Sequence, residues 1–157
     1  MAEASLSQLL PQDAIAAGIE AADWRAAIRA AGDLLVATGA ATADYIGEMH
    51  TAVEAYGPYI VIAPGIALAH SRPSPAVLHT GLSWAGMRTP VEFGHSTNDP
   101  VRLVIGLAAV DHDGHSSALS RLARMLSDPG RLARLTEATD PAEIHRTISE
   151  YESSEAT

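Results

Sequence analysis

A nearly unbroken apolar run at residues 101–110 is the sequence feature that most constrains the fold. It reads Val-Arg-Leu-Val-Ile-Gly-Leu-Ala-Ala-Val. A strand with one solvent-facing side alternates apolar and polar residues, so this run predicts a central strand covered on both faces. Such cover requires a layer of other elements on each side of a sheet.

Helical patterns before and after this run can supply both layers. Apolar residues recur at helical spacing over residues 23–38 and 42–56, and Asp23 is suited to cap the first of these helices. Three further helices are predicted over 116–126, from Asp128-Pro129 and from Asp140-Pro141. Strands are predicted over 13–22, 59–68 and 77–84. The order is therefore strand, two helices, three strands and three helices, and a mixed sheet with helices on both faces accounts for it.

Composition limits the class of protein. The chain has 157 residues, 47% of them apolar, which fits a single folded domain over residues 1–152 with a flexible tail at 153–157. The formal net charge is −9 and no basic stripe is present, which argues against nucleic-acid binding. We find no signal peptide and no run long enough to insert into a membrane, so a cytoplasmic location is expected. Without cysteine, a thiolate metal site and a cysteine nucleophile are excluded.

His70 is the first candidate for a reacting group. It ends the apolar run at 59–68, and Ser71-Arg72-Pro73-Ser74-Pro75 then forces a turn. An imidazole at the edge of a rigid strand, next to a guanidinium, is suited to act as a nucleophile. The alternative is that His70 merely ends a strand.

A second group of candidates follows the central run, in Asp111-His112-Asp113-Gly114-His115. His115 is predicted in or just before the first turn of a helix, where free N–H groups and the helix dipole favour an anion and a neutral imidazole. The same segment, with His70, could instead ligate Zn²⁺, although His-x-x-His spacing is common by chance. His95 lies in a polar turn, where a supporting role and an ordinary loop position are both open.

Five stretches taken together resemble the enzyme IIA proteins of the bacterial phosphoenolpyruvate-dependent sugar phosphotransferase system, mannitol/fructose type, and are most similar to the ascorbate-specific branch. They are residues 57–73, 78–83, 90–95, 98–101 and 107–111. The resemblance covers roughly residues 8 to 150, and it rests on these motifs occurring in this order. It implies an α+β fold, a three-layer α/β/α sandwich.

The resemblance also implies a function. Members of this family are phosphotransferases that accept a phosphoryl group from the phosphocarrier HPr on a histidine. They pass it to a IIB subunit, which phosphorylates sugar arriving through a IIC membrane permease. His70 matches the phosphorylated histidine and His115 the second histidine, which helps to stabilise the phosphoryl group. No cofactor and no metal is implied.

The chain departs from the family pattern at two places. Ala69 stands where the family usually has Pro, and Val53 or Glu54 stands where mannitol-type members carry an Arg. Arg72 could supply that missing charge. We also expect an apolar rim around His70 for docking of protein partners, with Trp84 or Met87 as members unless they are core residues.

Two other functions stay open. A IIA-like regulator would use phosphorylation of His70 as a switch that controls binding to a target. A metal-dependent hydrolase is a more distant alternative. The sequence leaves the transported sugar and the oligomeric state open, a homodimer included.

Overall fold

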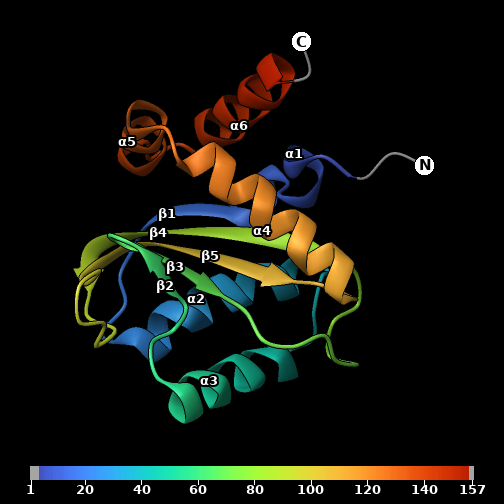
Figure 1. Ribbon diagram of the computed structural model, residues 1–157, viewed down its shortest axis with the longest axis vertical. Coiled ribbons are helices and arrows are strands. Elements are labelled where there is room, and N and C mark those ends of the chain that lie inside the picture. Colours follow the sequence, from blue (N-terminus) through green and yellow to red (C-terminus); the bar gives the residue numbers. More distant parts are fainter. Residues whose placement is uncertain (1–3, 156–157) are drawn as a thin grey trace.

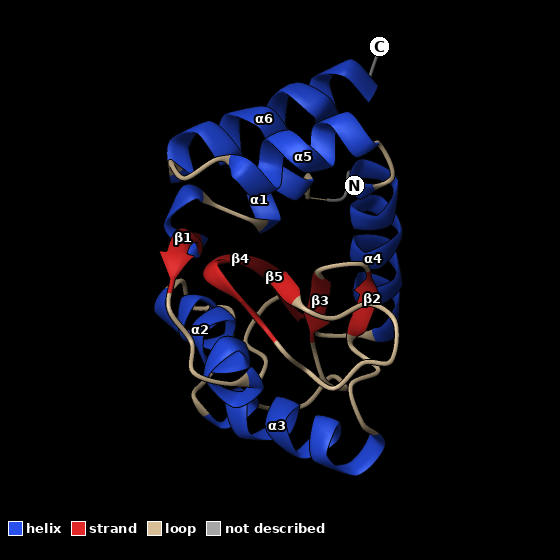
Figure 2. Ribbon diagram, turned by 90° about the vertical axis from the view of Figure 1, so that its left-hand side faces the viewer, coloured by secondary structure: helices blue, strands red, loops and turns tan. Residues whose placement is uncertain are grey.

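The computed structural model describes residues 4–155 as a three-layer α/β/α sandwich (Figures 1 and 2). Helices α2 and α3 cover one face of a mixed sheet, and α1, α4, α5 and α6 cover the other. In chain order the elements are α1 (Leu6–Leu9), the 3₁₀ turn η1 (Gln12–Ala14), β1 (Ile15–Ile19), α2 (Trp24–Ala37), α3 (Asp44–Tyr56), β2 (Val61–Ala63), β3 (Ile66–Ala69), β4 (Gly81–Val91), β5 (Val101–Ala108), α4 (His112–Leu126), α5 (Pro129–Glu137) and α6 (Pro141–Glu155).

The sheet has five strands in the order β1-β4-β5-β3-β2. β3 runs parallel to β5 and β1 parallel to β4, whereas β4 is antiparallel to β5 and β2 to β3. The carboxyl ends of β3 and β5 therefore lie at the same edge of the sheet. The expected mixed sheet with helices on both faces is confirmed.

β5 has the double cover that its apolar run predicts. Leu103, Ile105 and Leu107 pack into the core beneath α1, α4, α5 and α6. Val104 and Ala108 pack into the opposite core, against α2 and α3. Successive side chains of a strand point to opposite faces, and because both faces of the sheet are covered here, both sets are buried.

Two strand predictions were wrong in detail. The single strand expected over 59–68 is two antiparallel strands, β2 and β3. Pro64 has no N–H, and Gly65 adopts a positive φ of 79°, so the chain turns between them. The strand expected over 77–84 begins only at Gly81 and continues to Val91, and residue 77 forms just an isolated bridge to Ala41.

The helix predictions hold, with shifted ends. Asp23 caps α2 as expected, its carboxylate accepting the N–H of Ala26. α4 begins at His112 rather than at residue 116, because the Asp111 carboxylate caps it by accepting the N–H of Gly114. The short α1 was missed, although Ser5 and Gln8 form a capping box there. α6 continues through Glu155, into the segment expected to be a flexible tail, and residues 156 and 157 lie outside the described residues.

α2 lies very close to the sheet at Gly106 of β5. A Cβ atom there would lie 2.3 Å from Ser83 Oγ and 3.1 Å from Leu35 Cδ1. The Ser83 hydroxyl cannot move aside freely, because it is buried and donates a hydrogen bond of 2.8 Å to the Ala31 carbonyl of α2. Glycine at this position is thus needed for the contact between helix and sheet.

Replacing Gly106 by Ala should therefore destabilise the fold. Overpacking at a rigid contact lowers the free energy of unfolding by about 1–3 kcal/mol. Gly130→Ala in α5 is the control, because its new Cβ would lie 3.6 Å from the nearest atom, Asp128 Oδ2, which is an ordinary contact. Urea denaturation should show a lower midpoint for Gly106→Ala alone, and equal midpoints for both variants would contradict this account.

Candidate functional site

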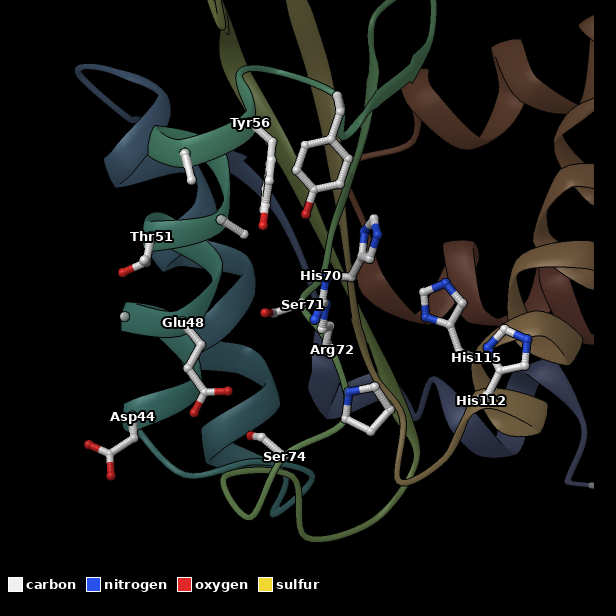
Figure 3. Close-up of a pocket in the computed structure, with 15 residues that line it drawn as sticks. Asp44, Glu48, Thr51, Tyr56, His70, Ser71, Arg72, Ser74, His112 and His115 are labelled. Atoms are coloured by element: carbon white, nitrogen blue, oxygen red, sulfur yellow. The ribbon is translucent and has the colours of Figure 1, made fainter.

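A cavity of about 1080 Å³ opens between α3 and the carboxyl ends of β3 and β5 (Figure 3). One wall is the face of α3 from Asp44 to Tyr56, which carries the carboxylates of Asp44 and Glu48. The facing wall is the segment 70–74 with the first turn of α4. The cavity thus has an acidic side and a side that bears imidazoles and a guanidinium.

His70 follows the last residue of β3 and lines this cavity. Its Nδ1 lies 2.7 Å from the carbonyl oxygen of Leu68. A carbonyl oxygen can only accept, so Nδ1 carries the proton and donates it, and in the neutral ring Nε2 keeps a free lone pair. Burial lowers the pKa of His70 below its ordinary value of 6.5, and the hydrogen bond to Leu68 opposes this in part. The ring is therefore mainly neutral at pH 7.

His115 lies beside His70, with the two ring centroids 5.1 Å apart and the ring planes at 56°. It belongs to the first turn of α4, as predicted. Its pKa is lowered by burial first, and then by the charges of His70 and His112. The direction of this shift is the one predicted from the helix dipole, and its causes are burial and the neighbouring imidazoles. Two neutral imidazoles at this distance can both contact one group bound between them.

Of the two supporting residues expected from the sequence, one lies at the site. Arg72 is exposed, lines the cavity and is the only guanidinium among the described residues that do so. His95 does not line the cavity. It precedes β5, at the opposite end of that strand, and its Nδ1 accepts the N–H groups of Thr97 and Asn98, so it stabilises its own turn.

The apolar rim consists of residues other than those expected. Trp84 and Met87 are 1% and 9% exposed and belong to the core, because β4 is covered on both faces. Tyr56 and Tyr59 instead line the cavity and are 71% and 43% exposed. The Tyr59 ring meets His70 edge to face, with centroids 5.5 Å apart. The Tyr-Gly-Pro-Tyr segment that ends α3 was the sequence signal for this rim.

Neither position proposed for the missing arginine faces the cavity. Val53 is buried in the core, and Glu54 pairs with Arg25 at 2.8 Å. The cavity wall of α3 includes the neighbouring positions Thr51, Ala52 and Ala55. The α3 wall therefore carries no Arg, and the guanidinium that lines the cavity is that of Arg72, on the facing wall.

The zinc alternative named His70, His112 and His115 with Asp111 and Asp113. In residues 4–155, no group of three or more histidine or carboxylate side chains is arranged to hold a metal ion. His112 does line the cavity, and its Nε2 lies 3.5 Å from Ser116 Oγ on the same helix.

Within residues 4–155, no helix is long and apolar enough to cross a membrane.

Comparison with known proteins gives a consistent result. The family model described as "Phosphoenolpyruvate-dependent sugar phosphotransferase system, EIIA 2" matches residues 8–151. The ascorbate-specific PTS system EIIA component of Escherichia coli (strain K12) is 36% identical over 126 residues, which are 80% of this chain and 82% of that protein.

Solved structures agree in fold. The solution structure of the mannitol-specific cryptic phosphotransferase enzyme IIA CmtB from Escherichia coli has a TM-score of 0.81 and 30% identity, covering 94% of this chain and 99% of that one. A complex of enzyme IIA and phosphorylated enzyme IIB for mannitol, also from Escherichia coli, matches with a TM-score of 0.78 and 28% identity, over 88% of this chain and 95% of that one.

The lowered pKa values of the two imidazoles can be measured directly. We expect NMR titration midpoints of His70 and His115 below the ordinary value of 6.5. In His70→Ala the midpoint of His115 should rise, because the substitution removes a neighbouring charge and exposes the ring. A ¹⁵N spectrum of neutral His70 should show the proton on Nδ1. A proton on Nε2, or an unchanged His115 midpoint in the variant, would contradict the geometry.

Proposed function

Because the chain belongs to the EIIA 2 family of the phosphoenolpyruvate-dependent sugar phosphotransferase system, it is a phosphotransferase relay component, and we propose that His70 is its phosphoryl carrier. The observation that carries this proposal is the pair of imidazoles 5.1 Å apart, one of which has a free, unprotonated Nε2. The donor is phospho-HPr, and the acceptor is a cysteine of a IIB protein that serves a IIC permease. Ascorbate or a similar sugar is the transported substrate.

The acceptance step follows from the tautomer of His70. The Nε2 lone pair attacks the phosphorus of the donor phosphohistidine, so a new N–P bond forms on His70 while the N–P bond of the donor breaks. The positive charge that develops on the His70 ring is stabilised at Nδ1–H by the Leu68 carbonyl. The bond that results keeps a high transfer potential, because no strong cation pair holds the phosphoryl oxygens.

His115 and Arg72 orient the phosphoryl group. A neutral His115 can donate one hydrogen bond to a phosphoryl oxygen, and the exposed Arg72 can contact another as the group arrives or leaves. In the onward step the N–P bond of His70 breaks and an S–P bond forms on the IIB thiolate. Positioning and charge stabilisation supply the catalysis, and no residue has to donate or remove a proton in either step.

Donor and acceptor are proteins, so they have to reach His70 in turn at one surface. The exposed Tyr56 and Tyr59, next to the imidazole, offer an apolar surface for such docking.

HPr and IIB proteins meet in the cytoplasm, which is the location we propose for this chain. A single IIA domain over residues 1–152 would carry the whole activity.

Replacing His70 by Ala should abolish labelling. The assay uses phosphoenolpyruvate, enzyme I, HPr and the purified chain, and follows acid-labile phosphate on the chain. The His70 side chain is only partly buried and belongs to neither hydrophobic core, so the variant should keep the far-UV circular dichroism and a urea midpoint close to that of the wild type. A folded His70→Ala protein that still takes the label on another residue would refute the assignment.

Replacing His115 by Ala should slow transfer without preventing it. One lost hydrogen bond to a charged group costs about 1.5–3 kcal/mol, which is roughly a ten- to hundredfold loss in rate if the bond acts in the transition state. Rapid-quench measurements of transfer from phospho-HPr, and from the labelled chain to a IIB protein, would show the change. His145→Ala is a matched control, since that imidazole contacts the Ser7 carbonyl far from the cavity. Equal rates in all three proteins would exclude a role for His115.

A further inference from the structure

Tyr45 makes the polar contacts that join the segment after His70 to the end of β5. Its hydroxyl donates to the carbonyl oxygen of Leu107 at 2.8 Å and accepts the backbone N–H of Ser71 at 2.9 Å. The Ser71 carbonyl lies farther from the hydroxyl, at 3.3 Å, so the single proton serves Leu107. One side chain of α3 therefore connects both strands that end at the site.

These two contacts fall where the sheet ladder would otherwise continue. β3 and β5 pair in parallel from Ile66↔Leu103 to Ala69↔Gly106. The N–H of Leu103 donates to the carbonyl of Gly65, and in a parallel ladder the pattern repeats at every second residue. The next bond beyond Ala69 would join the N–H of Ser71 to the carbonyl of Leu107. The Tyr45 hydroxyl stands between these same two groups.

The hydroxyl is fixed in this place. Tyr45 is 1% exposed, and its ring lies in the core between α3 and the sheet. Burial, the largest effect, raises its pKa to about 12, so the hydroxyl keeps its proton at every pH at which the protein functions. It can thus donate and accept at once without change of charge.

We propose that the Tyr45 hydroxyl is a spacer that holds the carboxyl ends of β3 and β5 apart and thereby positions His70 relative to His115. Where a direct bond would bring the two strands together, an inserted oxygen adds a second hydrogen bond to the span. His70 follows directly on the end of β3, and the segment after β5 runs through Asp111 into α4, which carries His115. The separation of the two strand ends therefore sets the separation of the two imidazoles. Tyr45 is accordingly a positioning residue, since it contacts the backbone and not the phosphoryl group.

This inference rests on the proposed transfer through His70, and it makes a separate prediction. In Tyr45→Phe the ring still fills the core, but Ser71 N–H and Leu107 C=O lose their partner. They either stay unpaired or close onto each other. Closing would move the His70 imidazole relative to His115, and unpaired strand ends would no longer hold it in one place. A displacement of about 1 Å in such a site can reduce a rate about a hundredfold.

The test compares Tyr45→Phe with Ser83→Ala. Ser83 offers a matched loss, because its buried hydroxyl also makes a 2.8 Å bond to a carbonyl, that of Ala31, but away from the cavity. We expect transfer from phospho-HPr to slow about tenfold or more in Tyr45→Phe and to stay at the wild-type rate in folded Ser83→Ala. The ring resonances of His70 and His115 should shift in the first variant only.

Each other outcome overturns part of the account. Equal slowing in both variants, or wild-type rates and unshifted rings in Tyr45→Phe, would leave Tyr45 a core residue and refute the spacer. A wild-type chain that takes no label from phospho-HPr would instead refute the proposed function.

A measurement on the unaltered protein covers the case in which Tyr45→Phe fails to fold. Hydrogen exchange should show the Ser71 amide protected like the ladder amides of β3, although it lies beyond the last paired residue. A Ser71 amide that exchanges as fast as an exposed loop amide would overturn the proposal.

Discussion

The parallel pairing of β3 with β5 is the constraint on which the site depends. Its register sets Ala69 opposite Gly106, so the residue after β3 and the helix after β5 emerge at one edge of the sheet. A slip of one residue would exchange the two faces of β3, so that Ile66 and Leu68 would point into the core beside α2 and α3 where the small Ala67 and Ala69 now lie. The apolar cover of β5 on both faces therefore fixes where the two imidazoles meet, although neither belongs to a core.

Two opposing effects set the chemistry of His70. Burial disfavours its charged form, while the Leu68 carbonyl favours a proton on Nδ1, and burial is the larger of the two. The balance leaves a neutral nucleophile whose tautomer is fixed. A dense cluster of cations would bind the phosphoryl group more tightly, but the onward step would then be slower, since only stabilisation of the transition state accelerates transfer. Under the proposed transfer, the one guanidinium that lines the cavity among residues 4–155, that of Arg72, suits a group that has to leave again.

Much of this could be predicted from the sequence because the signals are local. The run at 101–110 predicted a doubly covered strand, and Asp23 was predicted to cap α2. The Asp111 cap was missed, since the helix it begins was expected only from residue 116. Pro64-Gly65 is a recognisable turn signal, but the turn was missed because apolar residues on both sides made the segment resemble one strand. Tyr45 could not be identified, because a tyrosine at helical spacing resembles any core residue. Its role depends on Ser71 and Leu107, which lie 26 and 62 residues away.

Most of the large apolar side chains that are exposed lie at the edge of the sheet where the site is. Tyr56 and Tyr59 border the cavity, and Leu78 and Val110 lie in the loops that leave the same edge of the sheet, 58% and 49% exposed. Ile62 of β2 is also 44% exposed, but the other four exposed side chains lie at this edge, where their exposure has a cost that a docking surface would recover. The relay role proposed for His70 has two conflicting needs, since the imidazole must be accessible to a partner and yet be kept from water. His70 suits both needs, because the Tyr59 ring packs against it at 5.5 Å while the imidazole lines an open cavity.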